Sequence, residues 1–413
     1  MIRFSKTKAL TTALLLSAAP VYGFAQDTGA DHGEIDQVQF GDVWADMDVY
    51  VPESTVEVGS TSTAMGNNAS SVRISGDVSA EIRQDFNASA TATNRLRGYS
   101  AGNAVATTTA YGNAASGGTD YGTNTYRLQQ TAAGTVDART VIGLESAGTI
   151  TSATTAIANV SSTDNNFGES VSDQVQQSSA NVRAETDADM CCDGYYANFI
   201  TSAGANATSS TGYTSTNTNR ARQETAAGSR VEAATDVYMG DGTNVTAMTN
   251  AFGNSATVYN EWGYATLGQE GAPTEQVNGA DIDAQTYVTL DHWSGYANAS
   301  AYGVGNSALI SNVGSDTVMY ADQTNDGSVT TTASFAGESW TGGTAMVSAT
   351  SIGNAATATV CNYCSEASVG GRINQVNNGQ VQAFGQAQSV YGNAVYGSAT
   401  AIGNAATLQS AGD

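Results

Sequence analysis

The sequence predicts an all-β protein, a β-solenoid of about eight repeats of roughly 48 residues each. Three observations support this prediction: a Gly-Asn element recurs along the chain, a glutamine recurs in phase with it, and apolar and polar residues alternate between them. An eight-bladed β-propeller is the alternative, because four short strands in 48 residues also describe a propeller blade. The solenoid is favoured because the inward residues are mostly Ala, Val, Thr and Ser, and a narrow coil needs small side chains.

The Gly-Asn element predicts a corner of the backbone. Glycine supplies a positive φ angle and asparagine tolerates one, so the pair is typical of a sharp change of direction. An ordinary hairpin turn is the alternative. The corner glycines are Gly66, Gly112, Gly204, Gly253, Gly305, Gly353 and Gly403, and Ala158 takes the place of the glycine in the third copy. The intervals between successive copies are 46, 46, 46, 49, 52, 48 and 50 residues.

The recurring glutamine is predicted to point inward. From Ser71 to Gln84 apolar residues alternate with polar ones, and Gln84 shares the parity of the apolar set while Arg83 points outward. A buried amide is costly unless it is hydrogen-bonded, and amides stacked at a fixed offset can bond one another as in cross-β ladders. A separate bond from each glutamine to backbone is the alternative. Gln37 or Gln39 opens the series, which continues through Gln84, Gln130, Gln176, Gln223, Gln276, Gln323 and Gln375.

Each unit is expected to hold four strands: the glutamine strand, a strand before a mid-unit glycine, a strand entering Gly-Asn, and a polar strand leading to the next glutamine. Composition is even from Asp27 to Asp413, with no Pro-rich or Gly/Ser-rich linker that would divide it. One continuous array, residues 37–413, therefore fits better than several domains.

The N-terminus is typical of a Sec signal peptide, residues 1–25, followed by an acidic leader, residues 26–36. Arg3, Lys6 and Lys8 precede an apolar run, and Gly23 and Ala25 place small residues before the expected cleavage site. Nothing downstream approaches the twenty apolar residues of a transmembrane segment. We expect an exported protein at the cell surface, associated with the outer membrane.

Charge limits the partners. The predicted signal peptide holds three of the 14 basic residues and none of the 38 acidic ones, so the mature charge is 11 − 38 = −27, with no lysine. Such a chain disfavours nucleic acid and anionic lipid. We expect no cofactor; Ca²⁺ is conceivable only at the acidic patches Asp27–Asp36, Asp187–Asp193 and Asp281–Asp283, which match no known calcium-loop spacing and are better explained as solvated surface.

Catalytic chemistry has little support, and we predict that the protein is not an enzyme. The two histidines, His32 and His292, lie in no nucleophile or metal-ligand spacing. The four cysteines should be oxidised in an exported chain. We expect a local disulfide between Cys361 and Cys364 and a vicinal one between Cys191 and Cys192; a four-cysteine zinc site is the alternative.

Several segments resemble known surface proteins. QVNNGQVQAFG (375–385), QTNDGSV (323–329) and the small-residue core are similar to curli-type functional amyloid subunits, and the longer unit with elements such as TAIGNAAT resembles the holdfast-anchor HfaD family of stalked alphaproteobacteria. The resemblance implies a surface protein that fastens an adhesive polysaccharide to the outer membrane, with another anchor subunit and a secretion lipoprotein as partners. Curli units are about half as long, so it also implies two coils per unit.

Two functions follow as hypotheses. The leading one is a structural anchor or adhesin whose exposed strand edges recruit further copies or a partner by β-augmentation. The other is a carbohydrate-binding surface module without amyloid-like assembly, in which a row of rings stacks on sugars. The candidate rings, which we place just before the corner glycines, are Tyr111, Phe252, Tyr302 and Tyr391.

Overall fold

The computed structural model describes residues 31–338, 342–361 and 366–411, and this part of the chain consists of strands and short connections without helix. The all-β prediction is therefore confirmed. The strands are β1 Asp31–Gln39, β2 Val43–Val51, β3 Thr55–Arg73, β4 Val78–Thr119, β5 Thr123–Asn166, β6 Glu169–Ser178, β7 Asn181–Tyr213, β8 Thr216–Thr225, β9 Arg230–Glu261, β10 Ala265–Leu267, β11 Thr274–Asn278, β12 Asp281–Val313, β13 Thr317–Asn325, β14 Val329–Gly337, β15 Thr344–Cys361, β16 Val369–Asn377, β17 Val381–Ser389 and β18 Ala394–Ala411.

Each repeat pairs in parallel with the repeat before it and the repeat after it. Val78 pairs with Asn124, 46 residues later, and Thr317 pairs with Val369, 52 residues later. One repeat is thus one turn of the chain. The two coils per unit implied by the curli resemblance are wrong, because a second coil inside a repeat would halve this separation.

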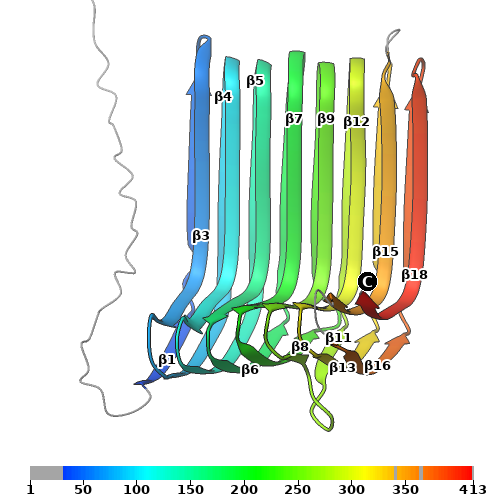
Figure 1. The fold of residues 1–413 in the computed structure, drawn as a ribbon. Helices are drawn as coiled ribbons and strands as arrows, with labels where there is room; N and C mark the ends of the chain where they lie inside the picture. The colour runs from blue at the N-terminus through cyan, green and yellow to red at the C-terminus, as the bar shows by residue number, and fades with distance from the viewer. Residues whose placement is uncertain (1–30, 339–341, 362–365, 412–413) are drawn as a thin grey trace, which may run out of the picture.

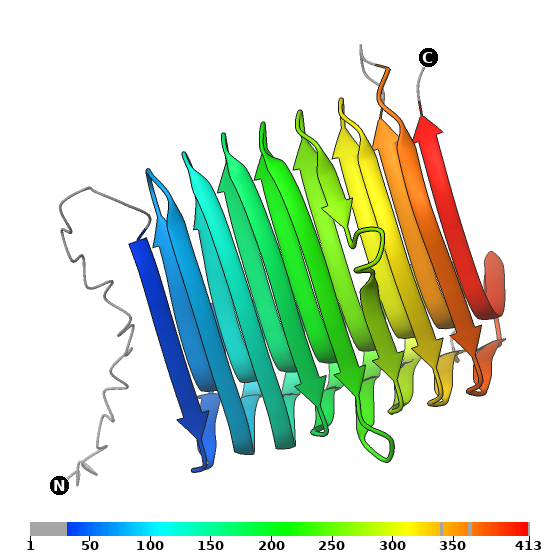
Figure 2. The same ribbon diagram turned by 90° about the horizontal axis from the view of Figure 1, so that it is seen from below.

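The turns of the chain lie side by side in sequence order. Figures 1 and 2 show the long strands advancing from the N-terminal repeat at one end to the C-terminal repeat at the other, with each strand bending near one end. The extra residues of the longer repeats lie in the connections between paired strands. The connection between β10 and β11, for example, carries a small antiparallel bridge between Gln269 and Ala272, while Gln276 stays in register with Gln223.

A repeat contains three strands where four were expected. In the last repeat, β16 carries the glutamine, β17 follows, and β18 runs through Gly403 and Asn404 without a break. The predicted third and fourth strands are one strand, because the backbone stays extended through Gly-Asn. In β4 and β5 even the connections between strands are absorbed into one long bent strand.

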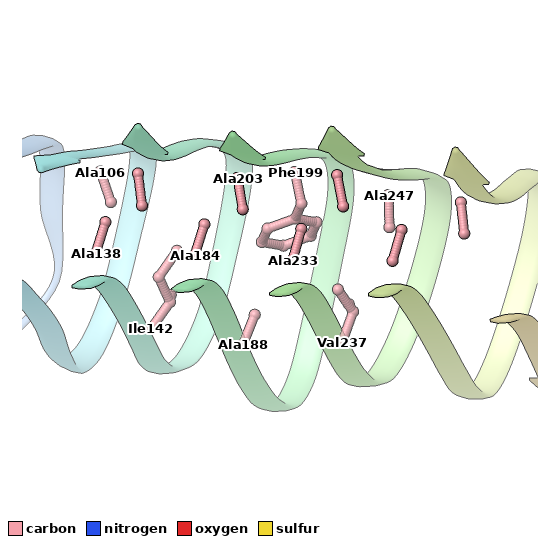
Figure 3. Packing of buried hydrophobic residues seen from close by; sticks show 14 of the residues in the cluster. Ala106, Ala138, Ile142, Ala184, Ala188, Phe199, Ala203, Ala233, Val237 and Ala247 are labelled. Atoms are coloured by element: carbon pink, nitrogen blue, oxygen red, sulfur yellow. The ribbon is translucent and has the colours of Figure 1, made fainter. Parts of the chain in front are cut away.

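The core is a thin layer of small side chains between two walls of each turn. Ala106, Ala203 and Ala247 on one wall point toward the opposite wall, which carries Ala138 and Ala233 (Figure 3). Burial alternates strictly along strands such as β8, as expected for a pleated strand with one covered face. Small residues let the walls approach closely, and single large ones such as Phe199 fill the wider places.

The first strand begins inside the segment expected to be an acidic leader. β1 starts at Asp31, and Asp36 pairs with Arg83 of the next turn. Residues 31–36 therefore belong to the first turn, because their backbone completes the ladder beside β4. The predicted signal peptide lies outside the described residues. Within the described ranges there is no helix of the length and apolar character needed to cross a membrane.

Candidate functional site

The repeated glutamines lie one above another and are joined side chain to side chain. Each donates from Nε2 to Oε1 of the glutamine in the preceding turn. The seven bonds run from Gln84 to Gln37 (2.8 Å), Gln130 to Gln84 (2.7 Å), Gln176 to Gln130 (2.8 Å), Gln223 to Gln176 (2.8 Å), Gln276 to Gln223 (2.7 Å), Gln323 to Gln276 (2.7 Å) and Gln375 to Gln323 (2.8 Å).

Every glutamine of this ladder also donates to backbone on the facing wall. Gln223, for example, gives its second Nε2 hydrogen to the Ser255 carbonyl at 2.8 Å. Both expected partners, the neighbouring amide and the backbone, are therefore present at once. A buried amide satisfied in this way does not suffer the penalty of an orphaned polar group.

A second ladder, which the sequence reasoning missed, is formed by the asparagines of the Gly-Asn elements. Each donates from Nδ2 to Oδ1 of the asparagine in the following turn, so this ladder runs in the opposite direction to the glutamines. Its members are Asn67, Asn113, Asn159, Asn206, Asn254, Asn306, Asn354 and Asn404, at 2.7 to 2.9 Å. The signal was the recurrence of these asparagines at intervals of 46 to 52 residues, which the sequence reasoning explained by backbone conformation alone.

The corner glycines do not adopt the expected positive φ. None of them is among the positive-φ glycines of the described chain. They are required instead by space: a Cβ on Gly305 would lie 2.3 Å from Oδ1 of Asn325 and 2.6 Å from the Gly353 carbonyl oxygen. The bend arises because two successive residues, Gly112 and Asn113 in the second turn, both face inward and shift the alternation by one.

Gly204 was assigned to the wrong register position. It pairs with Phe252, while Asn206 pairs with Asn254, so Ala205 occupies the place of the corner glycine, as Ala158 does one turn earlier. Alanine is accepted in these two turns because the facing column carries small residues there. That column reads Phe86, Ala132, Ser178, Thr225, Asn278, Asn325 and Asn377.

A chain of buried threonine hydroxyls crosses the core between the two walls. Consecutive Oγ1 atoms are 2.6 to 2.8 Å apart, and the last hydroxyl donates to the Ser300 carbonyl at 2.7 Å. The sequence reasoning counted these residues only as small. In spatial order they are Thr108, Thr140, Thr154, Thr186, Thr201, Thr235, Thr249 and Thr286.

Both amide ladders end in unsatisfied atoms. At the C-terminal end, Oε1 of Gln375 and Nδ2 of Asn404 have no partner among the described residues. At the N-terminal end, Oδ1 of Asn67 accepts nothing within that part of the chain, and Gln37 uses one Nε2 hydrogen on the Asn68 carbonyl. Each end therefore presents one free donor and one free acceptor, in opposite order.

The two ends also differ in charge. Residues 31–73 carry eight acidic side chains and one arginine, whereas Arg372 is the sole charged residue between 369 and 411. On the outer face, arginines pair with acids of adjacent turns, including acids of the N-terminal end: Arg83 lies 3.6 Å from Glu34, Arg97 2.5 Å from Asp48 and Arg222 2.9 Å from Asp173. The N-terminal end is strongly acidic and the C-terminal end is nearly uncharged.

The cysteines form no disulfide among the described residues. The sulfurs of Cys191 and Cys192 lie 2.9 Å apart as a hydrogen-bond contact without a covalent bond, at a register shift in β7. Cys361 is exposed at the end of β15, and Cys364 lies outside the described residues.

The remaining candidate groups do not converge on a reactive centre. His292 is exposed, with Nδ1 3.7 Å from Oδ1 of Asp241, and His32 is exposed in β1. No group of three or more potential ligands that could hold a metal ion occurs in the part of the chain that the structure describes.

The four rings suggested for sugar stacking do not form a row. Phe252 is in register with Val304, whereas Tyr302 is in register with Asn250, and Tyr391 lies in the connection after β17. Partial burial raises the pKa of both Tyr111 and Tyr302. Tyr302 and Tyr391 precede Gly303 and Gly392, which are not corner glycines, so they lie in other columns than Phe252.

The comparison with known families decides the assignment. A family model described as holdfast attachment protein D, HfaD, matches residues 52–329. The chain belongs to the HfaD family. No curated protein and no solved structure matches the chain. The resemblance to the HfaD family seen in the sequence is thereby confirmed.

Membership of the HfaD family makes this a cell-surface attachment protein, in a family of structural rather than enzymatic proteins. The matched segment begins just before β3 and ends at the start of β14. It contains the glutamine ladder from Gln84 to Gln323. The family match thus covers the ladder region and leaves the first and last strands outside it.

Proposed function

We propose that this HfaD-family chain is an exported β-solenoid that works as a cell-surface anchor, joining copies through its open strand edges and attaching adhesive polysaccharide to the cell envelope. The parallel pairing of each strand with the next repeat supports a solenoid, since a propeller blade would pair its strands with one another. Sec export, outer-membrane association, a second anchor protein and a secretion lipoprotein remain part of this proposal.

The observation that carries the proposal is the opposite polarity of the two amide ladders at the ends of the stack. Gln375 offers an acceptor and Asn404 a donor, while Gln37 offers a donor and Asn67 an acceptor. A C-terminal end laid on an N-terminal end in register completes both ladders. Two like ends would oppose acceptor to acceptor and donor to donor.

Shape is also complementary in the head-to-tail arrangement. Continuing the register across the junction sets Val381 over Val43 and Gly385 over Met47. The large side chain of Met47 would then face Gly385, which has no side chain. Core-facing Ala387 is exposed in the last turn, whereas its equivalent Phe335 is fully buried. Covering these positions removes apolar surface from water, which favours association.

Charge favours the same order. The register that stacks Gln375 on Gln37 also stacks Arg372 on Glu34 and Asn374 on Asp36. The amide of Asn374 already bonds an aspartate, Asp322, at 2.7 Å within the chain. Two acidic N-terminal ends would repel one another.

A charge swap tests this proposal on the purified exported chain. Arg372→Glu and Glu34→Arg should each shorten the assemblies seen by electron microscopy and sedimentation, and the double variant should recover most of the length. Arg127→Glu is the matched control, because Arg127 is exposed in the middle of the stack. In cells, the single variants should shed adhesive polysaccharide and the double variant should retain it. A wild-type chain that stays monomeric at tens of micromolar, or a swap without recovery, would overturn the proposal.

The carbohydrate-binding module without assembly remains the second candidate. It predicts that a monomer binds glycan and that the charge-swap variants bind it as the wild type does. The dispersed positions of Phe252, Tyr302 and Tyr391 do not support it in its original form.

A further inference from the structure

A shallow groove crosses the outer face of the stack near the C-terminal ends of the long strands, such as β5, β7 and β9. It consists of two adjoining hollows of about 390 and 340 Å³ that share Asp164 and Thr211. The first reaches back to Val72 in the first turn, and the second reaches forward to Val313 in the sixth. The groove therefore runs along the stacking direction and not along a strand.

Four exposed aromatic rings lie on or beside this groove. Tyr121, Phe167, Tyr213 and Tyr259 are 54%, 46%, 44% and 51% exposed. Tyr121 stacks on Phe167 with centroids 5.1 Å apart, and Phe167 meets Tyr213 edge to face at 5.5 Å. Tyr213 and Tyr259 line the second hollow directly. Contiguous exposed apolar surface of this kind is typical of binding sites.

The turn beside the groove is held in a strained conformation. Phe167, Thr214 and Trp262 occupy one position in successive turns, each with φ between 52° and 59°. This region is unfavourable for aromatic and β-branched residues, and such strain persists where surrounding structure imposes it. Here each N–H donates to a carbonyl of the following turn, as Thr214 does to Glu261 at 2.7 Å. These bonds hold Phe167, Thr214 and Trp262 at the spacing of the ladder, about 4.8 Å per turn, and keep the Phe167 ring beside Tyr213.

Most of the charged groups on the groove lining are carboxylates, and its other polar groups are hydroxyls and amides. Asp120, Asp164 and Glu261 contribute carboxylates, and Arg73 is the only basic residue on the lining. Its guanidinium is occupied by the carbonyls of Ser75 and Asp77, with Nη1 2.9 Å from the latter. Carboxylates accept hydrogen bonds from hydroxyl or ammonium groups and repel other anions. The chemistry excludes an acidic ligand.

We infer that this groove binds an extended polysaccharide of uncharged or amino-bearing sugars, with the faces of the sugar rings on Tyr213 and Tyr259 and their polar groups on the carboxylates. The inference deepens the proposed function, since it assigns the glycan contact to the side of the stack and leaves both ends for assembly. A linear glycan lying along the groove would cross several turns at once.

Affinity electrophoresis of the full exported chain tests the inference with three soluble probes: hydroxyethyl cellulose (neutral), glycol chitosan (amine-bearing) and polygalacturonate (uronate). The neutral or the amine-bearing probe should retard the wild type, and Tyr213→Ala/Tyr259→Ala should weaken that retardation by about tenfold, equivalent to about 1.4 kcal/mol of binding free energy. Tyr195→Ala/Tyr196→Ala is the control, because both rings are similarly exposed on the same turn away from the groove.

Retardation by polygalacturonate alone, no retardation by any probe, or equal loss in the control variant would each overturn the inference. Assembly length measured on the same samples separates the two proposals. Tyr213→Ala/Tyr259→Ala should assemble as the wild type does, because the groove lies away from both ends. A wild type that binds glycan without assembling would contradict the proposed assembly and leave the groove in place.

Discussion

Asn354 donates a hydrogen bond from Nδ2 to Oδ1 of Asn404 over 2.7 Å. The same asparagine also donates to the Val376 carbonyl at 2.8 Å, so its amide links the following turn and the facing wall. The glutamine ladder does the same in the opposite direction. Removing one amide should therefore disturb three turns.

Gln223→Leu should lower the free energy of unfolding strongly. The change leaves Nε2 of Gln276 and Oε1 of Gln176 buried without their ladder partner, at roughly 1–3 kcal/mol for each stranded group. Chemical denaturation followed by circular dichroism measures the loss. Gln177→Leu serves as the control, because Gln177 is exposed one turn before. Equal stability of the two variants would show that the ladder contributes nothing.

Gly305→Ala should be more harmful than the reverse change at Ala158. The added methyl would overlap Asn325 and the Gly353 carbonyl, and overpacking of this kind costs about 1–3 kcal/mol. Ala158→Gly should cost only about 0.5–1 kcal/mol, mainly from added freedom of the unfolded chain. Thermal melts of both variants check the order. A harmless Gly305→Ala would refute the close-approach explanation of the corner glycines.

The threonine chain should behave as a coupled network. Thr186→Val leaves the Thr154 and Thr201 hydroxyls short of a partner and should cost about 1–3 kcal/mol. Adding Thr201→Val should cost at least about 0.5 kcal/mol less than the sum of the single changes, since both members of one bond are then gone. Thr151→Val, on the exposed face of β5, should be nearly neutral. Strict additivity would argue against a network.

Two aspartates should make opposite contributions to the pH dependence of stability. Partial burial, and then the neighbouring Asp187 and Glu185, raise the pKa of Asp236. The folded state therefore holds this proton more tightly than the unfolded state, and stability from this group falls as pH rises above its ordinary value of 3.8. Asp236→Asn should stabilise the protein at pH 7 and have little effect at pH 3.

Asp316 should show the reverse sign. Hydrogen bonds from the backbone and then the side chain of Ser368 lower the pKa of Asp316, so its contribution is present above pH 3.8 and is lost on acidification. Asp316→Asn should destabilise at pH 7 and converge with the wild type in acid. Melting temperatures from pH 3 to pH 7 test both variants, and the same sign for the two would contradict the assignment.

The position of the ladder glutamines could be derived from the sequence because a strand alternates its side chains. Gln84 shares parity with Val78 and Ile82 in β4, so its direction follows from the pleat alone, whereas Val72, expected in the same strand, lies in β3 and is exposed. The direction of the hydrogen bonds could not be derived. It depends on which carbonyl of the facing wall competes for the second amide hydrogen, such as Ser255 for Gln223.

The corner glycines illustrate the opposite case. Their recurrence was visible, but glycine is selected both for positive φ and for lack of a Cβ, and the sequence does not separate these reasons. Contact with Asn325 or Phe86 across the turn decides in favour of space. The incorrect assignment of Gly204 as a corner glycine has the same origin, because the register is set by Asn206, which pairs with Asn254.

The sequence by itself determined the repeat, the strand parity and the inward amides, because these depend on short-range periodicity along one chain. Tertiary structure alone decided that one repeat makes one turn, that Asn404 and Gln375 leave complementary atoms at an open end, and that Tyr213 and Tyr259 border a groove. Those features depend on which turns lie side by side and in what register. Residues about 46 apart become neighbours only when the backbone ladders close.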